Sequence, residues 1–166
     1  AVVSEIVMNS KADTAVKVLE TLNNQAKESD SGLSLKVFVN LSKEENFENK
    51  LEKISNQSSI SENIVQEMIE KSIDDIEGDN DLTLIKDIID DSGNFLIDQV
   101  IKISKKTNNS NKLKIDDIID EIIKEEPIKA KEIIKIKKEK EIIEEPIKPK
   151  KIKEIKDVID TNISPN

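Results

Sequence analysis

The sequence predicts a mainly α-helical protein: a small helical domain with one β-strand element, or an α+β domain, followed by an amphipathic low-complexity tail that is helical or extended. Three observations support this fold class. Apolar residues recur at helical spacing through most of the first 104 residues. Residues 33–41 alternate instead with a period of two. From residue 113 onward Ile, Lys and Glu are strongly enriched, and prolines interrupt the pattern.

The composition limits the core to aliphatic side chains. The chain has 166 residues, enough for one ordinary domain with or without a tail, and its three phenylalanines are its only aromatic residues. Large rings usually supply much of the buried area in a small protein. We therefore expect a small core made chiefly of Ile, Leu and Val, with modest stability or with support from a partner.

The residue types that the sequence lacks exclude several classes of chemistry. Without His or Cys, the chain cannot form a Ser-His-Asp triad, a thiolate nucleophile or a zinc site of the usual nitrogen and sulfur ligands. All 26 basic residues are lysines, so no guanidinium group can bind a phosphate through two hydrogen bonds. We therefore predict a protein that is not an enzyme and has no catalytic, cofactor-binding or metal-binding residues. An enzyme that depends on a carboxylate or a lysine is the alternative from another class.

The first clear helix is predicted over residues 10–26. Its apolar residues fall on one helical face, and Ser10 with Asp13 provides an acceptable N-terminal cap. The polar sequence SDSG at residues 29–32 should end this helix.

Residues 33–41 carry the pattern of a half-buried β-strand. Apolar side chains alternate there with Ser34, Lys36, Phe38 and Asn40. A strand needs a pairing partner for its backbone groups. VVSEIV at residues 2–7 is a second strand candidate, although it can equally lead into a helix. If the two do not pair, the edge of 33–41 is open to a strand from another chain.

Further helices are predicted behind two capping boxes, Ser42 with Glu45 and Ser59 with Glu62. Short turns should separate these helices, so we expect them to stack as antiparallel neighbours. Their apolar faces lie at residues 47–54, 64–76, 82–89 and 95–101.

An acidic segment, DDIEGDND at residues 74–81, lies between two of these helices. We interpret it as helix punctuation, with Gly78 ending one helix and Asp79 or Asp81 beginning the next. A calcium loop of the EF-hand type does not fit, because Asn80 lies where that loop requires glycine.

The predicted domain organisation has three parts. Residues 1–104 form a helical head that contains the strand near 33–41, residues 105–112 form a polar linker, and residues 113–166 form the tail. The formal charge supports a division, because residues 1–111 carry a net charge of −9 and residues 112–166 a net charge of zero.

The tail nearly repeats a phrase, EIIKEEPIK from Glu121 and EIIEEPIK from Glu141. Isoleucines over 115–123 follow one helical face, but prolines break the pattern before it resumes over 152–159. Helices of roughly 10–17 residues are marginal in water without a surface to cover them. We therefore expect residues 112–160 to form little stable helix alone and to gain helix on the head, on another copy or on a partner.

Together these features predict a structural or protein–protein interaction protein, a scaffold or assembly component whose tail is a docking segment or a semi-rigid spacer. It should bind a protein partner or itself. Nucleic-acid binding is not expected because the first half is acidic and offers no aromatic stripe. Stable membrane insertion is not expected because no apolar run approaches about 18 residues. The candidate interaction residues are Leu35, Val37, Val39, Ile118, Ile122, Ile133, Ile152 and Ile155.

The cysteine-free, aromatic-poor composition and the helical head with a Pro/Lys/Glu tail resemble, in composition alone, exported structural or ruler-type proteins of bacterial secretion and flagellar systems. That resemblance implies an alternative function as a component of such an apparatus. The first ten residues, AVVSEIVMNS, lack the basic and long apolar regions of a signal peptide. We therefore expect a soluble protein that is cytoplasmic or exported by a route independent of a signal peptide.

Overall fold

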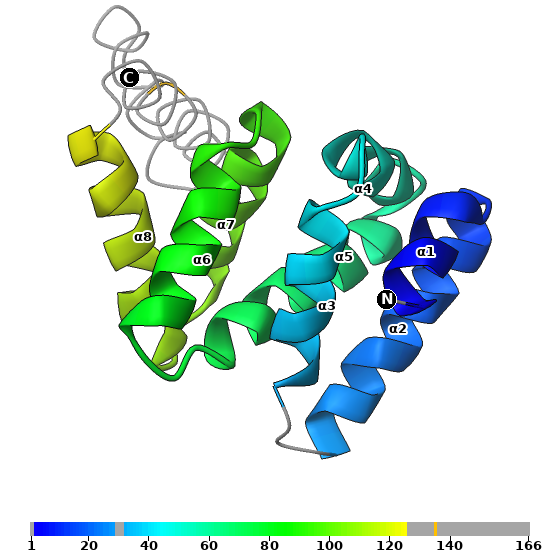
Figure 1. The fold of residues 1–166 in the computed structure, drawn as a ribbon, viewed down its shortest axis with the longest axis horizontal. Coiled ribbons are helices and arrows are strands. Elements are labelled where there is room, and N and C mark those ends of the chain that lie inside the picture. Colours follow the sequence, from blue (N-terminus) through cyan, green and yellow to red (C-terminus); the bar gives the residue numbers. More distant parts are fainter. Residues whose placement is uncertain (1, 29–31, 126–134, 136–166) are drawn as a thin grey trace, which may run out of the picture. The chain divides into compact units, whose positions relative to one another are not determined.

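The computed structural model describes residues 2–28, 32–125 and 135, and eight α-helices lie within these residues (Figure 1). The chain divides into two compact units, residues 1–126 and residues 127–166, and the fold described below is that of the first. The helices are α1 (Val2–Asn9), α2 (Ala12–Glu28), α3 (Leu33–Ser42), α4 (Phe47–Ser55), α5 (Ser59–Asp74), α6 (Asp79–Asp90), α7 (Asn94–Lys106) and α8 (Asn111–Glu125).

Helix α5 is the central element of the first unit. It packs against α2, α3 and α4 and also against α7 and α8 (Figure 1). Helix α1 packs on α2 and α3, and α6 packs on α8 and α3. The prediction of a mainly helical protein is therefore confirmed.

The core of this unit is almost entirely aliphatic, as the composition predicts. Phe38 is the only fully buried aromatic side chain, whereas Phe47 and Phe95 are half-buried. Isoleucines, leucines and valines supply nearly all other large buried side chains. Burying one such side chain is worth about 1.5–3 kcal/mol, so the many Ile positions can compensate for the missing rings.

The predicted β-strand at residues 33–41 is wrong, and the described residues contain no strand. Residues 33–42 form helix α3, with Leu35, Phe38 and Leu41 buried. The alternating pattern required Phe38 to point away from the core with the polar residues. Leu35, Phe38 and Leu41 instead recur every three residues, which places them on one helical face. The helical interpretation of residues 2–7 is the correct one, because they lie in α1.

Helix α3 packs on α5, and two hydrogen bonds join the start of α3 to the C-terminal end of α5. The backbone N–H of Leu35, in the first turn, donates to the Asp75 carboxylate just beyond α5 at 3.1 Å. The Ser72 hydroxyl of α5 donates to the Ser34 carbonyl at 3.0 Å. Gly32 precedes the helix with φ of 69°, a conformation that glycine adopts without strain.

One of the predicted capping boxes is wrong. Ser42 ends α3, and its hydroxyl donates to the Val39 carbonyl at 2.6 Å, so it does not form a capping box with Glu45. Helix α4 begins after Asn46, which has φ of 63°. Asparagine tolerates this left-handed conformation better than most residues do.

Two further predictions, for Ser59 and Gly78, are displaced by one to four residues. Ser58, not Ser59, caps α5, because its hydroxyl accepts a hydrogen bond from the Ser61 N–H at 3.0 Å. Gly78 does not end α5, which already ends at Asp74. It precedes α6 as the N-cap residue, and α6 begins at Asp79 as predicted.

Helix α7 receives its N-terminal cap from another helix. The Glu48 carboxylate of α4 accepts hydrogen bonds from the Gly93 N–H at 2.7 Å and from the Leu96 N–H at 3.1 Å. A negative group at a helix N-terminus is also favoured by the helix dipole. A Cβ atom on Gly93 would lie 3.1 Å from Glu48 Oε1, so the missing side chain permits this close approach.

Helix α8 belongs to the first unit and contributes to its core. Its isoleucines Ile115, Ile118, Ile119 and Ile122 are at most 3 % exposed. The helix packs against α5, α6 and α7. The structure places residues 105–106 at the end of α7 and residues 111–112 at the start of α8. The three-part domain division remains a prediction.

Candidate functional site

The predicted interaction residues of α3 lie mostly in the core. Leu35 and Val37 are 9 % and 5 % exposed, and Val39 is half-buried. Since residues 33–42 are helical, they offer no strand edge to a partner. Of these three side chains, a protein that binds the folded chain could reach only part of Val39.

The predicted interaction residues of α8 are also covered. Ile118 and Ile122 are each 1 % exposed. The remaining three, Ile133, Ile152 and Ile155, lie outside the described residues. A role for any of these side chains in binding a partner remains a prediction.

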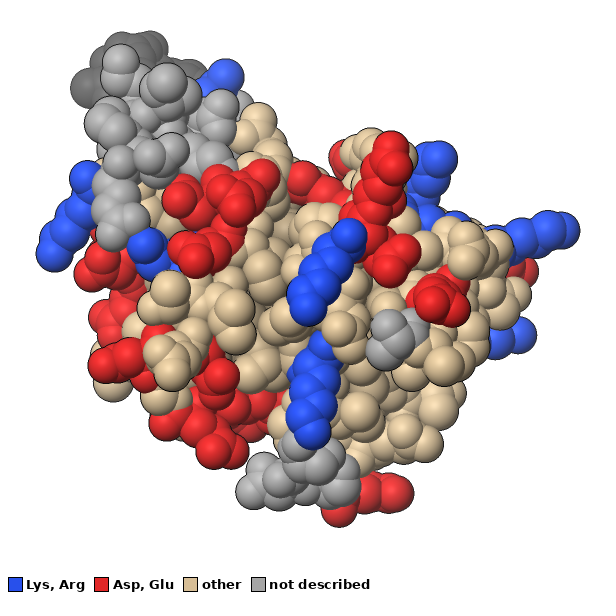
Figure 2. Space-filling view, viewed as in Figure 1, with Lys and Arg blue, Asp and Glu red and all other residues tan. Residues whose placement is uncertain are grey.

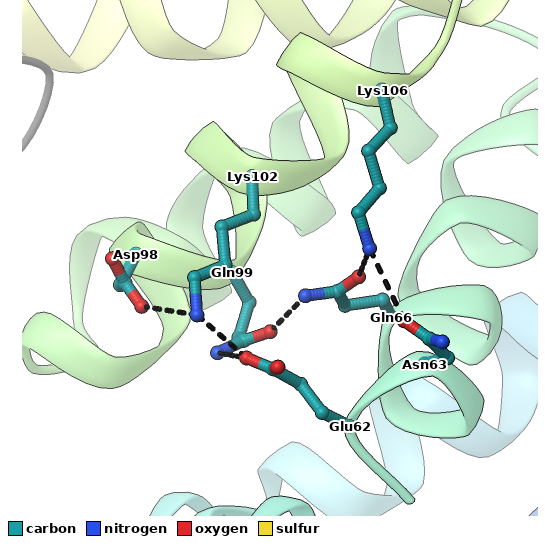
Figure 3. Close-up of polar contacts among 7 residues, drawn as sticks. All are labelled: Glu62, Asn63, Gln66, Asp98, Gln99, Lys102 and Lys106. Carbon is teal, nitrogen blue, oxygen red and sulfur yellow. Dashed lines mark hydrogen bonds and ion pairs between the residues drawn. The ribbon is translucent and has the colours of Figure 1, made fainter. Parts of the chain in front are cut away.

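A continuous chain of polar side chains joins α5 to α7 (Figure 3). At its centre, the buried Gln66 amide donates to the Gln99 side-chain oxygen at 2.8 Å. Gln99 in turn donates to Glu62 Oε2 at 3.3 Å. The same Glu62 oxygen accepts a hydrogen bond from Lys102 Nζ at 2.7 Å.

This polar network extends further at both ends (Figure 3). Lys102 Nζ lies 3.5 Å from Asp98 Oδ2, one helical turn earlier in α7. Lys106 Nζ donates to Gln66 Oε1 at 2.6 Å and to Asn63 Oδ1 at 3.2 Å. Gln66 and Gln99 are only 5 % and 2 % exposed. Buried amides of this kind are tolerated because each is hydrogen-bonded.

This network shifts the pKa values of its ion pair in opposite directions. The hydrogen bond from Lys102 lowers the pKa of Glu62, with help from Gln99 and the nearby positive charges, and these outweigh the opposing effect of burial. Burial lowers the pKa of Lys102, but the contacts with Glu62 and Asp98 outweigh it, so the net pKa is raised. Both groups are therefore charged at neutral pH.

The acidic segment at residues 74–81 uses two of its carboxylates to bind backbone groups. Asp75 accepts from the Leu35 N–H, and Asp81 accepts from the Glu77 N–H at 3.1 Å. Both contacts support the interpretation of the segment as helix punctuation. Within residues 2–28 and 32–125 the structure brings together no group of three acidic side chains that could hold a metal ion.

A groove with a volume of about 300 Å³ lies where α1, α2 and the start of α3 meet, and we call it the apolar groove. Val3, Val18, Leu22 and Leu33 line it, and Lys17 is the one charged side chain among the described lining residues. On the same α1 helix, Val2 and Ile6 are 70 % and 41 % exposed. Figure 2 shows a broad uncharged area over α1 and α2.

A second groove lies between α6 and α8, and we call it the acidic groove. Its volume is about 580 Å³. Figure 2 shows acidic side chains gathered over this part of the unit. Leu82 of α6 and Ile118 of α8 contribute apolar lining. The charged lining residues are Asp79, Lys86, Asp117, Asp120, Glu121 and Lys124.

Sequence reasoning missed the polar network and both grooves. Glu62 was interpreted as half of a capping box, whereas it binds across the helix interface. Gln66 and Gln99 did offer a signal, because each lies next to the apolar face of its helix. The grooves offered none, since they exist only where separate helices meet.

Comparison of the chain with protein-family models, with curated proteins and with solved structures found no match. Among the described helices, none combines the length and the apolar character needed to cross a membrane.

Proposed function

We propose that this chain is a non-enzymatic protein–protein interaction protein, a scaffold or assembly component, whose tail is a docking segment or spacer. The observation that carries the proposal is the apolar groove, which Val3 of α1 helps to line, together with Val2 and Ile6 exposed on the same helix. Exposed apolar patches typically mark binding sites.

The chemistry of the apolar groove defines its partner. Its mainly aliphatic lining, with Val18 and Leu33, favours aliphatic side chains, since burying apolar area contributes about 25 cal/mol per Å². Among the described residues that line it, Lys17 alone is charged, and it favours an acidic side chain beside it. The proposed occupant is therefore an amphipathic segment of another protein that carries aliphatic and acidic residues.

The polar network supports a non-enzymatic function. A carboxylic acid that donates a proton in catalysis usually has a raised pKa, and a lysine nucleophile a lowered one. Glu62 and Lys102 are shifted in the opposite directions. Their arrangement suits a permanent ion pair that fixes the packing of α5 and α7.

A substitution at the exposed Thr21 tests the proposal. Thr21 lines the apolar groove, so Thr21→Glu places a carboxylate where the partner's aliphatic side chains would bind. Asn49→Glu is the matched control, since it adds the same charge at an exposed position of α4. Proteins captured by the full-length chain would be purified, and their Kd for wild type and both variants measured by calorimetry.

We expect Thr21→Glu to weaken binding of the partner by about tenfold or more, because the added carboxylate is desolvated when the partner binds and also pairs with Lys17, one turn earlier in α2, in place of the partner's acidic side chain. Asn49→Glu should leave Kd unchanged. Equal effects of the two substitutions, or the absence of any captured protein sensitive to Thr21→Glu, would reject the proposal. Turnover of a small molecule by the purified chain would favour the enzyme alternative.

A further inference from the structure

The exposed face of α1 has the chemistry that the apolar groove requires of its occupant. Val2 and Ile6 lie one helical turn apart on this face and are 70 % and 41 % exposed. Glu5, which lies beside Ile6 in the sequence and one turn after Val2, is exposed as well. The occupant proposed above for this groove is an amphipathic segment with aliphatic and acidic side chains. The chain itself therefore contains such a segment.

Helix α1 cannot insert this face into the groove of its own fold. Its opposite side, which contains the fully buried Val7 and the almost fully buried Ser4, packs on α2 and α3. Val3 is the residue of α1 that lines the groove, whereas Val2 and Ile6 are not among its described lining residues. The exposed face therefore lies next to the groove, and a second copy must supply any α1 helix that fills it.

The α1 face and the groove carry opposite charges. Glu5 flanks the exposed face of α1, and Lys17 lines the groove. Both side chains are exposed, and within residues 2–28 and 32–125 neither forms an ion pair. Complementary charges at an interface orient the partner and disfavour other partners. Each surface thus offers a charge that the other can neutralise.

We propose that two copies of this chain form a dimer in which the α1 face of each copy fills the apolar groove of the other. The aliphatic side chains of that face contact the half-buried Val18 and Leu33 of the other copy. Glu5 of each copy pairs with Lys17 of the other. Because the face lies next to the groove, a single two-fold axis brings the two surfaces together twice.

The exposed apolar side chains of the fold are concentrated on α1. Among the described residues, five large apolar side chains are exposed, and two of them share this short helix. The other three lie singly on α5, α6 and α8. Single exposed apolar side chains need no explanation, whereas a cluster next to a groove indicates a contact. The dimer removes this cluster from water in both copies and covers part of the uncharged area over α1 and α2 (Figure 2).

The mass of the full-length chain in solution is the first test. Sedimentation velocity should show a reversible dimer at concentrations up to about 100 μM. Ile6→Gln should raise the Kd of this dimer by about tenfold or more, because an aliphatic side chain leaves the interface in each copy. Ile60→Gln is the matched control, since it makes the same change at an exposed position of α5 outside the groove. A chain that stays monomeric, or a dimer that both substitutions affect equally, would overturn the proposal.

Charge reversal tests the proposed ion pair and the symmetry together. Glu5→Lys and Lys17→Glu should each weaken the dimer by about fivefold or more, because each places like charges together at both contacts. An equimolar mixture of the two variants should restore the dimer, because position 5 of each copy again meets an opposite charge at position 17.

Two controls accompany the charge reversal. Circular dichroism checks that both variants stay folded, and Glu52→Lys and Lys53→Glu make the same reversals at exposed positions of α4 without affecting the dimer. Folded Glu5→Lys and Lys17→Glu variants that dimerise as tightly as wild type would overturn the proposal. A mixture of the two that does not dimerise would overturn it as well.

The inference rests on the proposed function, because it names the partner of the same apolar groove, but the two can fail separately. A chain that stays monomeric while Thr21→Glu weakens its binding of a captured protein would overturn the dimer alone. A dimer that responds as expected, in a chain that captures no other protein, would support the dimer and reject a scaffold for other proteins.

Discussion

The central helix α5 is held by different forces on its two sides. Toward α3 it meets a face with the buried Leu35, Phe38 and Leu41, where removal of apolar surface from water supplies the free energy. Toward α7 it meets the hydrogen-bonded chain of Glu62, Gln66, Gln99 and Lys102. The first kind of contact depends little on pH or salt. The second depends on both and also fixes the relative register of the two helices.

The largest effect is expected on the apolar side. Phe38→Ala should lower the free energy of unfolding by about 3–5 kcal/mol, because Phe38 is fully buried and its loss leaves a cavity. Urea denaturation of the full-length chain would measure the loss. Phe95→Ala is the control, since the half-buried Phe95 should cost clearly less. Equal losses for both would show that α3 does not anchor the core.

The next effect concerns α8, which packs on the same side of the unit as α7. Ile122→Ala should lower the free energy of unfolding by about 2–4 kcal/mol, because Ile122 is 1 % exposed. Ile123→Ala, at a half-buried position next to it, should cost less. Hydrogen exchange would check the packing directly, because α8 amides should be protected to the same degree as those of α5. Unprotected α8 amides would contradict its inclusion in the core.

Helices α3 and α8 also show what the sequence could and could not predict. The helical periodicity of α2, α5 and α7 was clear because each has many apolar residues on one face. The apolar residues of 33–41 fit both the period of two of a strand and the period of a helix. Only the position of Phe38 distinguished the helix from the strand. The isoleucine face of α8 was predicted, but its partner was left open between the head, another copy and another protein, since α8 covers α5, α6 and α7 through contacts that sequence spacing does not encode.

The candidate site was less predictable than the fold. Glu62 is close to the N-terminus of α5, so a local capping role was the simplest interpretation of its position. Its actual partner, Lys102, is 40 residues away. Likewise, the carboxylate that caps α7 comes from Glu48 in α4, and the one that accepts from Leu35 comes from Asp75. Local sequence rules cannot identify partners at such separations.

A smaller effect is expected on the polar side. Glu62→Gln should lower the free energy of unfolding by about 1–2 kcal/mol at pH 7, because it removes the charge that Lys102 pairs with in a half-buried site. Gln keeps the shape and one acceptor, so the change isolates the charge. Thermal or urea unfolding measures the difference from wild type. Glu20→Gln, at an exposed position of α2, should have almost no effect.

The difference in the free energy of unfolding between wild type and Glu62→Gln should depend on pH with a definite sign. The pKa of Glu62 is lowered in the folded state, so its contribution is present above the unfolded value of about 4.3 and is lost as pH falls through the folded pKa. The pKa of Lys102 is raised, so its contribution is complete below about 10.4 and is lost only as pH rises through the folded pKa. The gap between wild type and Glu62→Gln should therefore close in acid. A gap that is unchanged at pH 2 would contradict the assignment.

The smallest effect is expected where α4 caps α7. Glu48→Gln keeps one oxygen for the Gly93 N–H but removes the second acceptor, which binds the Leu96 N–H, together with the charge at the helix N-terminus. The expected loss is about 0.5–1 kcal/mol. Hydrogen exchange should report it first at the Leu96 amide, because that donor loses its partner.

Combining this substitution with Glu62→Gln tests whether α7 is held at two independent points. Glu48 binds the N-terminal end of α7, whereas Glu62 binds Gln99 and Lys102 further along the same helix. If α7 is rigid and each contact forms on its own, the two losses should add to within about 0.5 kcal/mol. A combined loss much smaller than the sum would mean that one substitution already releases α7. The polar side of α5 would then act as a single cooperative unit, in contrast to the separable side chains of its apolar side.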